Sequence, residues 1–353
     1  MPTTAPGLVP HLGSYRLSHQ EIIAKVQAGN SLSLDEMASA IGQMMQGGWT
    51  EEQMAALLLG LNEKGLVVDE VAGAAKAMRD HMVCIRAPHQ ALIDTCGTGG
   101  DGSGTFNIST ATALVIAGAG VSVAKHGNRS VTSRSGSADV LARLGVNIEA
   151  SVETIERCLE EVGICFCFAP LMHGSMKHVA PVRKKLGVPT IFNFLGPLCN
   201  PANAPFQLLG VGKAEYRELL AKALFRLGTS KAVFVTGRDG LDEVTLSDAT
   251  DVTIATQEGL VSVVWQPEEF GLSRQGKETM LVDGPEASAA MIREVLSGEQ
   301  GASRDIVVLN AAAALWTIGK SDSLDTCARL AEEAIDSGAA SKTLARLVKV
   351  SHA

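Results

Sequence analysis

The residues from Asp94 to Thr110 are of types that bind anions, and they read DTCGTGGDGSGTFNIST. Glycine recurs at positions 97, 99, 100, 102 and 104, so few side chains keep an anion from the backbone N–H groups. An apolar stretch that predicts a helix follows, and a helix N-terminus attracts negative charge. We therefore predict a phosphate or pyrophosphate cradle. A flexible hinge is the alternative, which the polar side chains of Asn107, Ser109 and Thr110 disfavour.

The same segment does not fit the common nucleotide-binding motifs. Gly97-x-Gly99-x-x-Gly102 matches the dinucleotide fingerprint formally, but that motif needs an acidic residue about 20 positions later. Residues 117–127 contain no Asp or Glu and instead present Lys125. The Gly-Lys-Ser/Thr ending of a Walker loop is also missing. We therefore expect neither a nicotinamide site nor an ATP-hydrolysis site.

A cationic and polar segment, KHGNRSVTS, occupies residues 125–133 directly after an apolar run that predicts a strand. Lys125 and Arg129 supply positive charge, and Asn128 and the hydroxyl residues supply hydrogen bonds. His126 leaves two interpretations open, a structural hydrogen bond or a proton transfer. The combination of charge and hydrogen bonds predicts a segment that binds a sugar phosphate.

Two adjacent acids, Asp242 and Glu243, lie in the sequence GLDEVT at residues 240–245, again after an apolar strand. Taken alone, such a pair is more often a surface turn. Together with water and phosphate oxygens, however, two carboxylates complete the coordination shell of Mg²⁺. In a magnesium–pyrophosphate complex the acids would bind the metal and the basic segment would bind the phosphates. We therefore predict Mg²⁺ as the cofactor.

The elements that position these residues begin with helices. The stretch from Ser18 to about Met82 has helical periodicity and three capping boxes. We predict a flexible extension over residues 1–17 and a helical domain over residues 18–88, to which a proline-bearing stretch at about 181–205 returns. The capping boxes are Ser18 with Glu21, Ser33 with Glu36, and Thr50 with Gln53.

From residue 89 to residue 353 the pattern predicts an α/β domain. Short apolar runs alternate with amphipathic ones, which is typical of a mostly parallel sheet with its ligands at the carboxyl ends of the strands. The expected fold is thus a small amino-terminal helical domain plus a larger α/β domain. The expected strands are 91–93, 121–124, 164–169 and 232–235, and the expected helices between them are 137–144, 151–161 and 214–227.

Composition disfavours several classes of protein. The 353 residues include 30 basic and 38 acidic ones, a net charge of -8, which repels nucleic acids and anionic lipids. Scattered cysteines without a Cys-x-x-Cys pair indicate neither a disulfide framework nor a zinc cluster. The first residues lack the apolar core of a secretory signal, and no apolar run is long enough to cross a bilayer. We expect a cytoplasmic location, with no nucleic-acid partner and no membrane partner.

Taken together, the motifs resemble those of the anthranilate phosphoribosyltransferases of tryptophan biosynthesis. The likeness covers nearly the whole chain after about Leu17, and its motifs occur in the family's order. They are the glycine-rich segment, Lys-His-Gly-Asn-Arg-Ser at 125–130, Gly-Ser-Ala-Asp at 136–139, Pro-Val-Arg-Lys-Lys-Leu-Gly at 181–187 with Phe-Asn-x-Leu-Gly-Pro-Leu-x-Asn-Pro at 192–201, and Gly-Leu-Asp-Glu at 240–243.

The resemblance implies a nucleoside phosphorylase/phosphoribosyltransferase-like fold and a homodimer formed through the helical domain. It also implies transfer of phosphoribose from 5-phosphoribosyl 1-pyrophosphate (PRPP) to the amine of anthranilate. The residues implied to bind PRPP are Gly97, Gly100, Asp101, Thr105, Asn107, Ile108, Ser109, Thr110, Lys125, His126, Gly127, Asn128, Arg129, Ser130, Val131, Thr132, Ser133 and Ser137. Ser109, Asp242 and Glu243 are implied to hold magnesium, and Gly97, Asn128 and Arg183 to meet anthranilate. Lys125, Asn128 and Arg183 are the implied catalytic residues.

The expected chemistry is displacement at ribose C1, in which the developing charge on pyrophosphate is stabilised. A pyrimidine nucleoside phosphorylase and a noncatalytic nucleic-acid-binding relative are the alternatives. One departure from the family pattern is Pro189, which replaces an expected arginine before Thr190 and removes a cation near the segment that approaches the acceptor.

Overall fold

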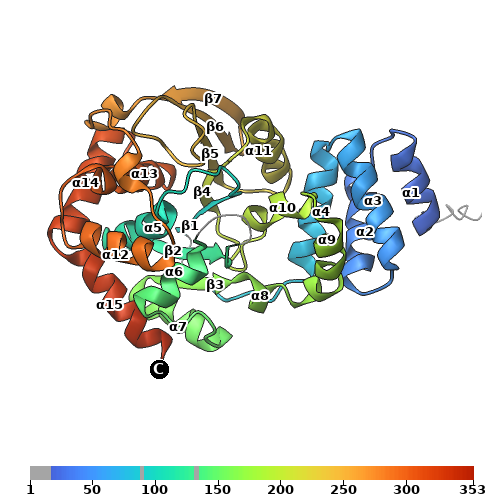
Figure 1. Cartoon of the computed structure of the whole chain (residues 1–353), viewed down its shortest axis with the longest axis horizontal. Coiled ribbons are helices and arrows are strands. Elements are labelled where there is room, and N and C mark those ends of the chain that lie inside the picture. Colours follow the sequence, from blue (N-terminus) through green and yellow to red (C-terminus); the bar gives the residue numbers. More distant parts are fainter. Residues whose placement is uncertain (1–16, 88–90, 131–134) are drawn as a thin grey trace, which may run out of the picture.

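A computed structural model of the chain describes residues 17–87, 91–130 and 135–353. A bundle of helices lies on one side and a larger α/β unit on the other (Figure 1). Val131, Thr132 and Ser133, which are predicted to bind PRPP, lie outside the described residues. No helix in the described ranges is both long enough and apolar enough to span a bilayer.

The bundle contains four helices, of which three have the predicted starts. Capping boxes are present at Ser18, Ser33 and Thr50, which confirms those predictions. The fourth helix begins after Val67, whose side chain cannot accept a hydrogen bond, and its N–H donates instead to the Glu70 carboxylate at 3.1 Å. This start therefore lacks the usual signature. The bounds are α1 His19–Gln27, α2 Leu34–Met45, α3 Glu51–Lys64 and α4 Val68–Asp80.

The sheet has seven strands in the order β3-β2-β1-β4-β5-β6-β7. The strands from β3 to β5 pair in parallel, whereas β6 and β7 add an antiparallel hairpin at one edge. The prediction of a mostly parallel sheet is thus confirmed, although β4, β6 and β7 were not predicted. The bounds are β1 Leu92–Gly97, β2 Ser122–Gly127, β3 Ile164–Phe168, β4 Phe206–Gly210, β5 Lys231–Gly237, β6 Thr250–Thr256 and β7 Gly259–Trp265.

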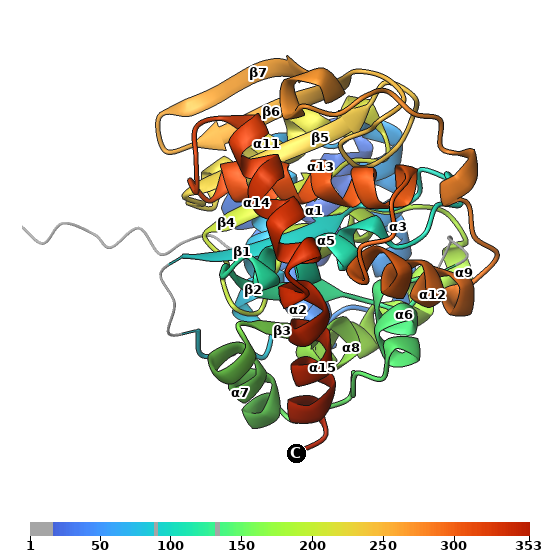
Figure 2. The same ribbon diagram turned by 90° about the vertical axis from the view of Figure 1, so that its left-hand side faces the viewer.

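Helices cover both faces of the sheet. Figures 1 and 2 show α5, α13, α14 and α15 on the face away from the bundle, with α11 on the opposite face. The bounds are α5 Ile108–Gly118, α6 Ser137–Leu144, α7 Val152–Val162, α8 Ala169–Met172, α9 Ala180–Leu186, α10 Phe192–Leu195, α11 Arg217–Arg226, α12 Pro285–Leu296, α13 Ala302–Thr317, α14 Leu324–Asp336 and α15 Ala339–Ser351. The expected helix over 214–227 begins as a 3-10 turn before α11.

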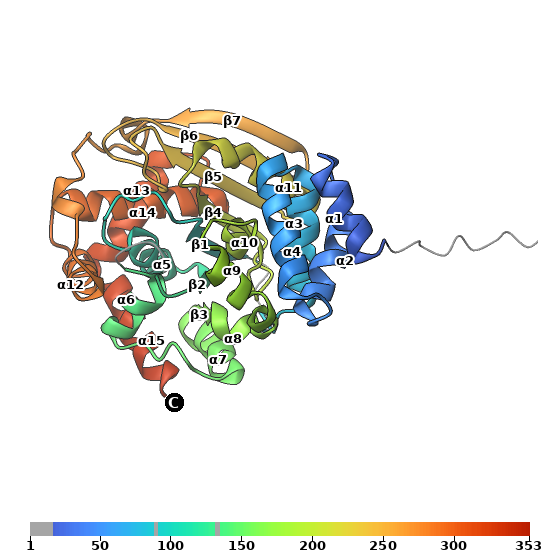
Figure 3. The same cartoon turned by 45° about the vertical axis from the view of Figure 1, so that its right-hand side comes forward.

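Two hydrophobic cores hold these layers together. One lies between the sheet and the helices on its far side, and the other joins the bundle to α9, α10, α11 and the near face of the sheet. Figure 3 shows α9 and α10 between the bundle and the sheet. Arg79 on α4 donates from Nε to the Leu198 carbonyl at 2.8 Å, which ties the bundle to the chain after α10. The segment near α10 is thus held by both parts of the fold.

Candidate active site

A cavity of about 540 Å³ lies beyond the carboxyl ends of β1 and β2. It is lined by the glycine-rich segment, by the end of β2 and the residues after it, and by the acid pair that follows β5. These segments are far apart in the sequence, and the parallel sheet brings them to one edge. The convergence expected from the sequence is therefore present in the fold.

Most of the predicted site residues line this cavity. They are Gly97, Gly100, Asp101, Thr105, Asn107, Ile108, Ser109, Lys125, His126, Gly127, Asn128, Arg129, Ser130, Ser137, Arg183, Asp242 and Glu243. Thr110 is not among the residues that line this cavity, and its buried hydroxyl donates to the side-chain oxygen of Asn107 one turn earlier. Its contact with PRPP stays a prediction.

The glycine-rich segment is a loop that bends sharply and ends at the N-terminus of α5. Gly99, Gly100, Gly102 and Gly104 have φ of 65°, 80°, 67° and 71°, a left-handed conformation that other residues rarely adopt. The far end of the loop is fixed by backbone hydrogen bonds of 2.9 Å from Phe106 N–H to the Met280 carbonyl and from Val282 N–H to the Gly104 carbonyl. The loop thus has the geometry of an anion cradle.

Lys125 is a buried cation at the floor of the cavity. The structure places it inside β2, not in the loop after the strand where the sequence placed it. Its Nζ donates to the Thr95 carbonyl at 2.6 Å and to Ser109 Oγ at 3.3 Å. Burial lowers the pKa of Lys125, and the buried carboxylate of Asp94 opposes that shift. The lysine is therefore held rigidly, with its charge beside the glycine-rich loop.

His126 makes structural hydrogen bonds through both ring nitrogens. Its Nδ1 lies 3.1 Å from the Gly196 carbonyl oxygen, so Nδ1 carries the proton. Its Nε2 lies 3.2 Å from Nε2 of His173. Burial, together with His173, lowers the pKa of His126 to about 3. Of the two interpretations left open by the sequence, this geometry favours the structural one.

Asp242 and Glu243 bring negative charge to the cavity, and Glu243 interacts electrostatically with Lys125. The Gly99 N–H donates to Asp242 Oδ2 at 3.1 Å, and a Cβ on Gly97 would lie 2.9 Å from the same oxygen. Burial and the nearby charge of Asp101 raise the pKa of Asp242 to about 7. Burial and the charge of Asp242 raise the pKa of Glu243 as well. Such a crowded set of carboxylates is stabilised by a cation.

The donor set suits a magnesium ion that is shared with a substrate. Among the described residues, no group of three or more His, Cys, Asp or Glu side chains is arranged to hold a metal by itself. Asp242, Glu243 and the Ser109 hydroxyl line the same cavity and supply only oxygen ligands. Mg²⁺ usually keeps waters and takes phosphate oxygens alongside one or two carboxylates. These residues fit that pattern.

Arg183 on α9 provides the cation on the side of the cavity nearest the bundle. Its Nη2 donates to Asn193 Oδ1 at 3.3 Å, and its guanidinium lies 5.6 Å from the centre of the Phe192 ring. Within the described ranges it forms no ion pair with a carboxylate of the protein. Burial lowers the pKa of Arg183. A guanidinium so placed suits a planar carboxylate as its partner.

Several lining residues have no role in the sequence-based prediction. Phe192, Asn193, Gly196 and Pro197 form the wall beside Arg183. They lie in the Phe-Asn-x-Leu-Gly-Pro motif, so the motif itself was the signal that could have identified them.

Pro189 lies away from this cavity. It lines a second cavity of about 270 Å³ together with Leu61, Leu66 and Lys213, and its carbonyl accepts a hydrogen bond of 2.6 Å from Asn62 on α3. The next residue, Thr190, donates from its N–H to Asn193 Oδ1 at 3.0 Å, the oxygen that also accepts from Arg183. The effect of Pro189 on the acceptor site stays a prediction.

The comparisons with known proteins agree with this architecture. Residues 89–341 match the α/β domain of a glycosyl transferase family, and residues 20–82 match the helical bundle domain of such a family. The chain is 49% identical to the anthranilate phosphoribosyltransferase of Rubrobacter xylanophilus, over 94% of this chain and 97% of that protein.

Solved structures are similar as well. The enzyme of the same name from Thermus thermophilus gives a TM-score of 0.87 at 41% identity, over 94% of this chain and 99% of that one. The Saccharomyces cerevisiae enzyme in complex with PRPP and Mg gives a TM-score of 0.85 at 29% identity, over 95% and 98% of the two chains. The likeness therefore spans both parts of the fold.

Proposed function

The chain belongs to the anthranilate phosphoribosyltransferase family, and from that premise we propose which of its residues bind the two substrates and the metal. The protein is a pentosyltransferase of tryptophan biosynthesis. It transfers the phosphoribosyl group of PRPP to the amine of anthranilate, and the products are N-(5-phosphoribosyl)anthranilate and pyrophosphate. The observation that carries the assignment of residues is the convergence of the glycine-rich loop, β2 and the acid pair on one cavity.

The donor PRPP binds with its diphosphate on the glycine-rich loop and at the N-terminus of α5. The backbone N–H groups of the loop and the charge of Lys125 offset the phosphate charge. The residues that we assign to PRPP are the predicted ones that line the cavity. Thr110, Val131, Thr132 and Ser133 stay predictions.

The metal is Mg²⁺, held by Asp242, Glu243 and the Ser109 hydroxyl. When bound, it neutralises charge on the diphosphate and so makes pyrophosphate a better leaving group. Asp242 accepts the Gly99 N–H, so the carboxylates that would hold the metal lie beside the glycine-rich loop. The loop and the acid pair thus act on the same end of PRPP.

The acceptor anthranilate binds between Arg183, Asn128 and Gly97. Arg183 pairs with the carboxylate, and glycine at position 97 lets the Asp242 carboxylate approach the backbone on that side, since a Cβ there would lie 2.9 Å from Asp242 Oδ2. In the reaction the bond between C1 and the diphosphate oxygen breaks, its electron pair leaves with pyrophosphate, and the amine nitrogen bonds to C1. The nitrogen, which is positively charged once it is bonded to C1, then gives up a proton to water or to the released pyrophosphate. An aromatic amine is neutral at pH 7, so positioning by Asn128 and Arg183 contributes more than a strong base.

Three further assignments rest mainly on the family resemblance. They are a homodimer formed through the helical domain, a cytoplasmic location, and a division into domains at residues 18–88 and 89–353. The matches over residues 20–82 and 89–341 support the last of these. Light scattering coupled to gel filtration measures the oligomeric state directly.

The test of the reaction is a simple assay. Purified protein is mixed with anthranilate, PRPP and MgCl₂, and the loss of anthranilate fluorescence is followed with each component omitted in turn. The expected result is turnover that needs all three. Phosphorolysis of a pyrimidine nucleoside without consumption of anthranilate would instead support a nucleoside phosphorylase.

A further inference from the structure

The loop that carries the acid pair is a short segment, Gly240–Val244, between β5 and β6, and we call it the acid loop. Its two carboxylates repel each other, and both are also repelled by Asp101. Holding the side chains of Asp242 and Glu243 close together is therefore electrostatically unfavourable. A loop that holds them toward one cavity needs support from the rest of its backbone. The structure contains that support on both sides of the loop.

Asn310 supports the acid loop from the core. It lies in the middle of α13 and is 0% exposed, with apolar neighbours such as Leu309 and Ala311. Its Oδ1 accepts the N–H of Val244 at 2.9 Å, and its Nδ2 donates to the Val244 carbonyl at 2.9 Å. The second proton of Nδ2 goes to the Ile306 carbonyl at 2.9 Å. One side chain thus satisfies both backbone groups of the residue that follows Glu243.

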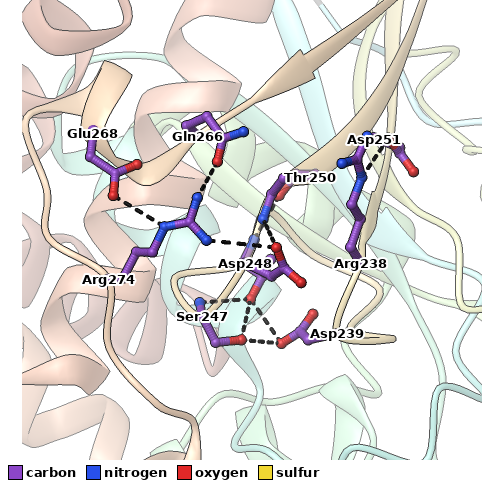
Figure 4. A network of polar contacts seen from close by, with 11 residues as sticks. Arg238, Asp239, Ser247, Asp248, Thr250, Asp251, Gln266, Glu268 and Arg274 are labelled. Carbon is purple, nitrogen blue, oxygen red and sulfur yellow. Dashed lines mark hydrogen bonds and ion pairs between the residues drawn. The ribbon is translucent and has the colours of Figure 1, made fainter.

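Asp239 supports the same loop from the other side. Its carboxylate accepts hydrogen bonds from the Leu241 N–H at 3.3 Å, from the Thr245 hydroxyl at 2.9 Å and from the Ser247 hydroxyl at 2.5 Å. Figure 4 shows Asp239 and Ser247 facing each other within a wider polar network that includes Asp248 and Arg274. Asp239 therefore ties the beginning of the acid loop to the residues after it.

The middle of the acid loop rests on β4. A Cβ placed on Gly210 would lie 1.6 Å from the Asp242 carbonyl oxygen, so only glycine fits at this position. Neither Asn310 nor Asp239 lines the cavity. Their side chains reach the acid loop through the backbone of Val244 and Leu241 and through the hydroxyl of Thr245, which directly follows the loop.

We propose that Asn310 and Asp239 are positioning residues that hold the acid loop ready for the magnesium–diphosphate complex. This inference rests on the proposed function, since it concerns the metal assigned to Asp242 and Glu243. Without the Asn310 amide, the buried N–H and carbonyl of Val244 lose their partners, and the loop shifts or opens to satisfy them. The ordered position of the carboxylates is then lost before metal and PRPP bind.

The test uses N310L, which keeps the side-chain size but removes both hydrogen bonds to Val244, and D239A. The matched control is T317V on the same helix, because Thr317 is also 0% exposed and its hydroxyl bonds only within α13, to the Ala313 carbonyl. Calorimetry measures binding of PRPP in the presence of Mg²⁺, and hydrogen–deuterium exchange measures opening of residues 240–247 in metal-free protein.

The expected result is that N310L and D239A each weaken magnesium–PRPP binding about 10-fold and speed exchange over residues 240–247, whereas T317V does neither. The KM for anthranilate should change less than about 2-fold. If N310L does not fold, D239A alone tests the inference. Asp239 is partly exposed, so replacing it leaves the hydrophobic core intact. Wild-type binding and wild-type exchange in the folded variants would overturn the inference. If the wild-type protein itself does not bind magnesium–PRPP, the metal assignment under the proposed function fails instead.

Discussion

The Nε2 atoms of His126 and His173 lie 3.2 Å apart in the buried wall behind the cavity. Because Nδ1 of His126 carries a proton for the Gly196 carbonyl, its Nε2 accepts and Nε2 of His173 donates. The pair therefore fits best when both rings are neutral. This arrangement fixes one wall of the cavity and takes His126 out of proton transfer.

Acid should destabilise the fold through this pair. Burial and His173 lower the pKa of His126 to about 3, and burial lowers that of His173 to about 4. Unfolded histidines take up protons near pH 6.5, so the unfolded state binds more protons as the pH falls from about 6.5 to about 4. The free energy of unfolding should therefore fall over this window, by up to about 1.4 kcal/mol per pH unit for each histidine.

Urea titrations at several pH values measure this slope. His173→Gln removes one titrating group and keeps a donor for His126, so its slope should be shallower. His352→Gln, at an exposed position, is the control for the substitution itself. An equal slope in wild type and His173→Gln would show that the pair does not stay neutral in the folded protein.

Arg183→Ala should affect the acceptor more than the donor. Loss of a charge-assisted pair with the anthranilate carboxylate costs about 1.5–3 kcal/mol, which corresponds to roughly a 10- to 150-fold rise in the KM for anthranilate. The KM for PRPP should change much less. Steady-state kinetics with each substrate varied measures the difference. Lys184→Ala, an exposed neighbour on α9, should behave like wild type. Equal changes in both constants would argue against the pairing.

Asp242→Asn with Glu243→Gln should weaken magnesium-dependent turnover. The double variant removes the anionic oxygen ligands and keeps the size of both side chains, so activity at limiting Mg²⁺ should fall by about 100-fold or more. Asp248→Asn is a suitable control, because Asp248 pairs with Arg274 at 3.6 Å outside the cavity. A wild-type rate for the double variant at limiting Mg²⁺ would exclude the metal assignment.

Binding of the metal should depend on pH. The pKa of Asp242 is raised to about 7 by burial and by Asp101, and a protonated carboxyl is a poor ligand. Protons therefore compete with the metal below about pH 7, and the affinity for Mg²⁺ with PRPP should rise between pH 6 and pH 8. Calorimetry in buffers of different ionisation enthalpy measures the released protons. In the Asp242→Asn variant this release should be smaller.

Local sequence patterns predicted the parts of the site that follow strands. The glycine-rich loop, the end of β2 and Asp242–Glu243 could be identified because parallel strands end at one edge of a sheet. The sequence placed Lys125 in the loop after the strand, whereas β2 continues through Lys125 to Gly127. A charged residue at the end of an apolar run is usually taken as the end of the strand. The error concerns the boundary of a strand, which polar residues at a functional site obscure.

The partners of buried polar side chains could not be predicted. A lone Asn310 in an apolar helix indicates that some backbone group is satisfied there, but its sequence neighbours do not identify Val244 as that group. The hydrogen bond from His126 to the Gly196 carbonyl could not be predicted either, because the two residues are far apart in the sequence and come together only in the folded protein. The hairpin β6–β7 was missed as well, since its outer strand alternates buried and exposed residues only weakly.

A crystal structure of the protein with PRPP and Mg²⁺ tests the central claim most directly. The account predicts a diphosphate on the loop Gly97–Thr105 near Lys125, with the metal between it and the side chains of Asp242, Glu243 and Ser109. A diphosphate bound elsewhere in the molecule, or a metal that contacts neither Asp242 nor Glu243, would contradict it.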